Sequence, residues 1–175
     1  MVIPGDIIGN CCGQPFSSKG FGEAYKHTAN QIFSKLWHWS RQGTIPVLMD
    51  ITSCTQSLHT ARPYLSEENQ VKFDQLKIMD SIEYIADVLL PKLTISRPKN
   101  KVVFHPVCSV YKMNLYHKLQ LIGESCATHL HLPANTGCCG MAGDRGFYYP
   151  GLIKAATNDE AAEVNQEIYD GYFIC

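Results

Sequence analysis

Lys101-Val-Val-Phe-His-Pro-Val-Cys108 decides the fold, because it joins a short apolar strand to a cysteine at the strand's carboxyl end. Residues 101–104, apolar after Lys101, predict a buried strand, and the proline at 106 predicts the loop that leaves it. The run from Pro46 to Ile51 is built in the same way, with Cys54 shortly after it. Strands that end in cysteine-bearing loops predict a site at one edge of a sheet.

Helical patterns alternate with these strands. Apolar spacing predicts one or two helices over 66–90, single helices over 23–41, 111–129 and about 150–169, and a further strand at 172–174. This alternation predicts an α/β fold with three layers and a mostly parallel sheet. The chain has 175 residues, close to the size of one domain, so we expect a single cysteine-rich domain over 1–175.

Composition narrows the class of protein. The net charge of -1 argues against a nucleic-acid partner and allows at most peripheral membrane association. Charged residues make up 18% of the chain where about 25% is typical, which predicts a surface covered by another domain or subunit. The start of the chain lacks the features of a signal peptide, so the expected location is the cytoplasm, with the inner face of the membrane as the alternative.

The triplet Cys-Cys-Gly occurs twice and marks an internal repeat. Each copy follows a proline-containing strand end, which places a short strand near Ile7 and Ile8, and each precedes a basic-Gly-Phe step, a helix and a strand. The two triplets are Cys11-Cys12-Gly13 and Cys138-Cys139-Gly140, and the two steps are Lys19-Gly20-Phe21 and Arg145-Gly146-Phe147. We therefore expect two pseudo-repeated units, about 1–60 and 100–175.

Seven of the eight cysteines are candidate metal ligands: Cys11, Cys12, Cys54, Cys108, Cys138, Cys139 and Cys175. Thiolates are soft ligands that favour iron–sulfur clusters or zinc, and loops at strand ends can gather them from distant segments. The glycine after each pair lets the backbone approach inorganic sulfide closely. The eighth cysteine, Cys126, lies within a helical pattern and is predicted to be a core residue.

Three motifs resemble those of a known family. They are Cys11-Cys-Gly-Gln-Pro-Phe-Ser-Ser-Lys-Gly-Phe21, His105-Pro-Val-Cys-Ser109 and Cys138-Cys-Gly-Met-Ala-Gly-Asp-Arg-Gly-Phe147. Together they are similar to the carboxyl-terminal region of flavin- and iron–sulfur-containing D-lactate dehydrogenases. The triplet pattern also resembles the cysteine-rich domains of heterodisulfide reductase and of glycolate oxidase iron–sulfur subunits. The resemblance covers nearly the whole chain.

The resemblance implies that an upstream FAD domain oxidises a 2-hydroxy acid such as D-lactate, and that electrons pass through iron–sulfur centres to a quinone or a cytochrome. It implies a [4Fe-4S] cluster held by Cys108, Cys138 and Cys139, with either Cys175 or a residue beyond it as the fourth ligand. In the first unit Cys11, Cys12 and Cys54 lack the cysteine that the family has ahead of its triplet. The segment by itself is expected to be inactive as an enzyme.

Other interpretations of the same residues stay open. A zinc-stabilised structural or docking module would use these thiolates without redox chemistry. A thiol–disulfide reductase domain would need one reactive cysteine of low pKa. His105 has two interpretations, a partner or proton carrier for a cluster and a structural residue of the turn before Cys108.

Overall fold

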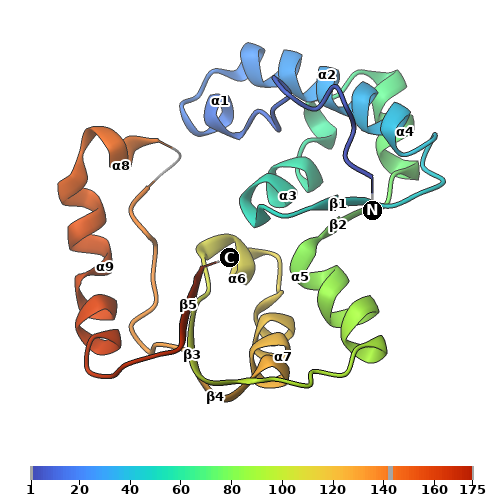
Figure 1. Cartoon of the computed structure of the whole chain (residues 1–175). Helices are drawn as coiled ribbons and strands as arrows, with labels where there is room; N and C mark the ends of the chain where they lie inside the picture. The colour runs from blue at the N-terminus through green and yellow to red at the C-terminus, as the bar shows by residue number, and fades with distance from the viewer. Residues whose placement is uncertain (1, 142–143, 175) are drawn as a thin grey trace. The chain divides into compact units, whose positions relative to one another are not determined.

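The computed structural model describes residues 2–141 and 144–174, and the chain divides into two compact units, Met1–Asp80 and Ser81–Cys175. Helices and strands alternate within each unit, and the strand pairs that the structure describes are parallel (Figure 1). The prediction of an α/β fold with parallel strands is therefore confirmed. The predicted halves, about 1–60 and 100–175, each fall within one unit.

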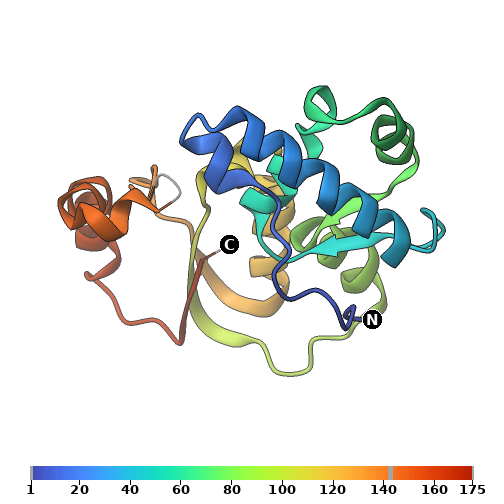
Figure 2. The same cartoon turned by 90° about the horizontal axis from the view of Figure 1, so that it is seen from above.

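Unit 1 packs helices on a two-stranded sheet. Its elements are α1 (Gln14–Ser18), α2 (Gly22–Trp39), β1 (Val47–Met49), α3 (Thr52–His59), η1 (Arg62–Tyr64), α4 (Glu67–Gln75) and β2 (Ile78–Asp80). Helix α2, the long blue helix of Figure 2, carries Phe33 and Leu36 of the core. Val47 and Ile78 from the paired strands pack against this core. Burial of each such side chain stabilises the fold by about 1.5–3 kcal/mol, so this core fixes the end of β1, which precedes α3.

Unit 2 is built around a three-stranded sheet in the order β4-β3-β5. Its elements are α5 (Ser81–Tyr84), η2 (Ile85–Leu89), η3 (Leu90–Lys92), β3 (Lys99–His105), α6 (Cys108–Lys112), α7 (Tyr116–Cys126), β4 (Ala127–His131), α8 (Arg145–Tyr148), α9 (Pro150–Val164) and β5 (Gly171–Ile174). The central strand β3 pairs with both neighbours in parallel.

The two faces of β3 meet different helices, because successive side chains of a strand point to opposite faces. Val102 and Phe104 belong to the core that includes Leu119 of α7. On the other face, Val103 and His105 line a cavity together with residues of α9. Figure 1 shows α7 and α9 on opposite sides of the strands, which gives this unit its three layers.

Several sequence predictions were wrong in detail. The strands form two sheets instead of one. The segment around Ile7 and Ile8 forms turns instead of a strand, and Ile8 is 91% exposed because it has no core to pack on. Cys54 lies in the first turn of α3 instead of in a loop.

Two of the predicted helices include residues that form strands in the structure. The helical pattern over 66–90 covers the residues of β2, and the helical pattern over 111–129 covers the start of β4. Both strands are short, and a run of three to five residues shows too little periodicity to separate a strand from a turn of helix. Their parallel pairing with β1 and β3 decides the outcome.

Candidate cysteine sites

The first triplet forms a tight turn ahead of α1. Gly13 has a φ of 85°, and a Cβ at this position would lie 2.8 Å from Cδ2 of Tyr25, so only glycine fits without movement. The Gly13 backbone N–H donates to Sγ of Cys11 at 3.4 Å. This turn leaves Cys11 exposed, while Cys12 enters the core and is only 7% exposed.

Cys12 meets Cys54, which lies 42 positions later in the sequence. Their Sγ atoms are 3.3 Å apart, a hydrogen-bonding distance for sulfur and well beyond the roughly 2.05 Å of a disulfide bond. Cys54 is half-buried. The structure therefore brings together two of the predicted ligand residues as free thiols.

The contact between Cys12 and Cys54 shifts their pKa values in opposite directions. The hydrogen bond from Cys54 lowers the pKa of Cys12 to about 6 against the opposing effect of burial, and the backbone N–H of Gln14 adds to the lowering. The same hydrogen bond raises the pKa of Cys54, as do burial and the charge of Cys12. At neutral pH the pair therefore consists of a Cys12 thiolate and a Cys54 thiol. The thiolate is the form that binds metals and attacks electrophiles.

A buried polar contact supports α3 next to this pair. The Thr55 hydroxyl donates to Oδ2 of Asp80 at 2.7 Å, and both side chains are fully buried. The Tyr25 hydroxyl donates to the carbonyl of Ser57 at 3.2 Å. These bonds join α3 to β2 and α2, so they fix the helix turn that carries Cys54. The helical pattern predicted over 66–90 gave no sign of Asp80 as a site residue, because it places this residue inside a helix.

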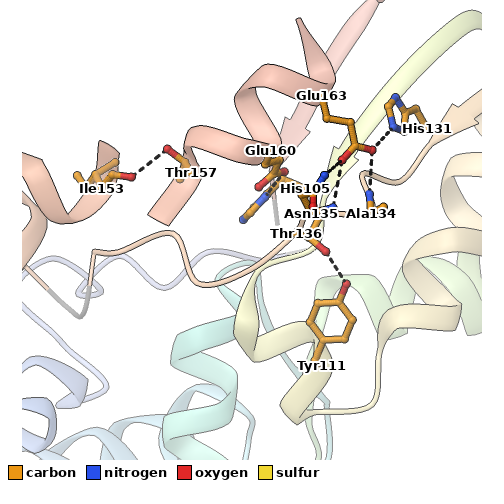
Figure 3. A network of polar contacts seen from close by, with 10 residues as sticks. All are labelled: His105, Tyr111, His131, Ala134, Asn135, Thr136, Ile153, Thr157, Glu160 and Glu163. Atoms are coloured by element: carbon orange, nitrogen blue, oxygen red, sulfur yellow. Dashed lines mark hydrogen bonds and ion pairs between the residues drawn. The ribbon is translucent and has the colours of Figure 1, made fainter. Parts of the chain in front are cut away.

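The cysteines of unit 2 lie in different surroundings. Cys108 is the first residue of α6 and is exposed. Cys138 is exposed and Cys139 is half-buried, and both lie in the segment 132–141 after β4, which has no helix or strand. The hydroxyls of Tyr111 and Thr136 lie 3.1 Å apart and connect α6 to this segment (Figure 3). Cys175 lies outside the described residues.

Glu163 of α9 binds the segment that leads to the second triplet. Its carboxylate accepts the backbone N–H groups of Ala134 at 2.9 Å and Asn135 at 3.1 Å, together with a side-chain N–H of Asn135. His131 contacts the same carboxylate through Nε2 at 3.0 Å, as Figure 3 shows. The Ala134 bond, followed by the His131 bond, lowers the pKa of Glu163 to about 2.

His105 pairs with a second carboxylate of α9. Its Nδ1 lies 2.6 Å from Oε1 of Glu160, and the two side chains are 15% and 11% exposed (Figure 3). The other ring nitrogen, Nε2, is buried without a hydrogen-bond partner. His105 was a candidate from the sequence, whereas neither Glu160 nor Glu163 was predicted. Their spacing of three residues, which puts them on one face of α9, was the available signal.

Cysteine side chains are suitable ligands for an iron–sulfur cluster, but the described residues do not bring enough of them together at one point. In the part of the chain that the structure describes, no three His, Cys, Asp or Glu side chains lie close enough to hold a metal ion. Cys12 and Cys54 supply two soft ligands at one point, where a cluster or a structural zinc takes four. Cys126, at the end of α7, is half-buried, and its predicted role in the core stays a prediction.

No protein-family model, curated protein or solved structure matches this chain. Among the described helices, none combines the length and the apolar character that crossing a membrane requires. The function is therefore inferred from the cysteines and their surroundings, since a fold class alone does not specify an activity.

Proposed function

We propose that this chain is the electron-transferring, iron–sulfur part of a flavin-linked 2-hydroxy-acid dehydrogenase. The observation that carries the proposal is the 3.3 Å contact between Cys12 and Cys54, because it joins two candidate ligands from distant segments. The resemblance of the three motifs to D-lactate dehydrogenases adds the cluster type, the FAD partner and the quinone or cytochrome acceptor. The protein's own contribution is a thiolate at Cys12, positioned by the Gly13 turn and by α3.

Anaerobic reconstitution with iron and sulfide tests this proposal. The wild-type chain should take up both and develop visible sulfur-to-iron absorption. Cys54→Ser and Cys138→Ser should each lower the iron and sulfide content, one for each unit. Cys126→Ser is the matched control and should load like the wild type. A colourless wild-type protein, or one that holds zinc alone at full occupancy, would contradict the proposal.

A second candidate function is thiol–disulfide chemistry at the same pair. It is favoured by the close approach of a thiolate and a neutral thiol, which is the arrangement of an attacking and a resolving cysteine. Cys12 would attack a disulfide such as oxidised glutathione and release one glutathione. Cys54 would then lose its proton, displace the second glutathione, and leave a Cys12–Cys54 disulfide.

Mass spectrometry distinguishes the two candidates. Cluster-free protein treated with oxidised glutathione should lose two hydrogen atoms and yield a peptide pair that joins Cys12 to Cys54. Cys54→Ser should instead stop at a mixed disulfide with glutathione on Cys12. If the wild type also stops at that adduct, the second candidate is wrong and the iron–sulfur proposal is unaffected.

A further inference from the structure

The free thiols of Cys12 and Cys54 lie at the margin of the unit 1 core. Cys12 is buried in that core, and Cys54 packs against it from the first turn of α3. Cys54 is only half-buried, and Cys11 and Ser53, which adjoin the pair in sequence, are exposed. The pair therefore lies near the surface of the unit, within reach of a small ion.

The number of ligands decides which metal ion suits this pair. Among the residues that the structure describes, no third His, Cys, Asp or Glu joins Cys12 and Cys54 to complete a larger metal site. Structural zinc and iron–sulfur clusters take four ligands. Cu(I) is a soft ion that prefers thiolates and is satisfied by two of them. Two sulfurs without further ligands therefore favour Cu(I).

The pair needs only a small change in geometry to hold an ion. The two Sγ atoms are 3.3 Å apart. A zinc–thiolate bond is about 2.3 Å long, and two bonds of that length to one ion would place the sulfurs at most about 4.6 Å apart. Rotation about the Cα–Cβ bonds of the two cysteines moves the sulfurs over such a distance while the backbone stays in place.

We propose that Cys12 and Cys54 of the cluster-free chain bind one Cu(I) ion between their sulfurs. Cys12 contributes its thiolate and Cys54 releases its proton to solvent, so the ion takes the place of the proton between the two sulfurs. One positive charge replaces another, and the net charge of the pair is unchanged. The inference rests on the proposed function in one respect, because the bound ion would occupy two candidate cluster ligands and block cluster assembly in unit 1.

Titration of the cluster-free full chain with Cu(I) tests this site. Under anaerobic conditions, with bicinchoninate as the competing chelator, the wild type should retain one Cu(I) ion after copper on single thiols has been removed. X-ray absorption should show two sulfur neighbours for the retained ion. The ion should also protect Cys12 and Cys54 from iodoacetamide, as measured by peptide mass spectrometry.

Two variants locate the ion. Cys54→Ser should lose the retained copper, whereas Cys139→Ser, which removes a half-buried thiol of unit 2, should keep it. If Cys54→Ser does not fold, the protection of Cys12 and Cys54 in the wild type decides by itself. Loss of all copper to the chelator, three or more sulfur neighbours, or protection of other cysteines in place of these two would overturn the proposal.

The results for copper and for the cluster can be told apart, because the titration contains no iron or sulfide. A chain that retains Cu(I) but stays colourless on reconstitution would contradict the proposed function alone. A chain that assembles a cluster but yields all its copper to the chelator would contradict this inference alone.

Discussion

In the thiol pair of unit 1, the negative charge of the thiolate lies on Sγ of Cys12. Cys12 carries the negative charge because its hydrogen bond with Cys54 lowers its pKa, and the core around Cys12 keeps most water away. Two coupled thiols lose their protons in two separate steps, so the acidity belongs to the pair. A thiolate is the form of cysteine that binds metals and attacks disulfides.

Alkylation tests this acidity. The pH profile for modification of Cys12 by iodoacetamide should have its midpoint near pH 6 in the cluster-free chain. Cys54→Ala removes the donor and should move the midpoint towards the ordinary thiol value of 9.0. Peptide mass spectrometry measures the rates, and Cys126→Ala serves as the control. An unchanged midpoint in Cys54→Ala would show that the hydrogen bond does not set the acidity.

Gly13 and Gly9 form a matched pair of glycines. Both have positive φ, 85° and 83°, so alanine at either site should cost about 1–2 kcal/mol of unfolding free energy. Only Gly13 has a side chain in the way, because its new Cβ would meet Tyr25 at 2.8 Å while Gly9 has nothing within 4 Å. Gly13→Ala should therefore be the more destabilising variant in urea unfolding. Equal losses would argue against a tight turn at the first triplet.

At the scale of elements, α9 organises the strand ends of unit 2 through two carboxylates one turn apart. Glu160 holds His105 at the end of β3, and Glu163 holds the segment after β4. Each carboxylate reaches across to a different segment of the sheet layer. Helix α9 thus positions both the turn before Cys108 and the segment that leads to Cys138.

Unfolding at low pH tests how much Glu163 contributes to the stability of the fold. Its pKa is lowered from 4.5 to about 2, so its stabilising contribution is complete above pH 4.5 and disappears as the pH falls from 4.5 towards 2. Glu163→Gln should be less stable at pH 7 and should lose less stability across this window. Amide exchange at Ala134 and Asn135, measured by NMR, should become faster in the variant. Parallel stability curves for both proteins would contradict this role.

At the scale of the whole molecule, two separate cores hold the chain together. Phe33 and Leu58 are fully buried in the core of unit 1, and Leu119 and Val110 are buried in that of unit 2. Each core lies within one unit of the chain. Each cysteine triplet therefore depends on the packing of its own unit.

Truncation of one core side chain in each unit tests this division. Phe33→Ala should cost about 3–5 kcal/mol and Leu119→Ala about 2–5 kcal/mol, because each leaves a cavity. Native-state hydrogen exchange should show the loss in α2 for Phe33→Ala and in β3 and α7 for Leu119→Ala. Unchanged exchange in α2 of the Phe33→Ala variant would contradict the assignment of Phe33 to this core.

Much of the fold could be predicted from residues close together in sequence. The spacing of apolar residues predicts α2, β1, β3 and β5, because helical and strand periodicities are local properties. Strand β2 was missed because Ile78-Met79-Asp80 is too short to show alternation, and only its pairing with β1 makes it a strand. The pseudo-repeat and the cluster ligands stay predictions.

The sequence by itself determined the α/β class and the positions of the cysteine triplets, since these depend on residue type and short-range order. Only the tertiary structure decided that Cys12 meets Cys54, that Asp80 supports Thr55, and that Glu160 leaves one nitrogen of His105 free of partners. The physical reason is distance along the chain. Contacts between residues 25 to 55 positions apart form only when buried packing closes the intervening loops.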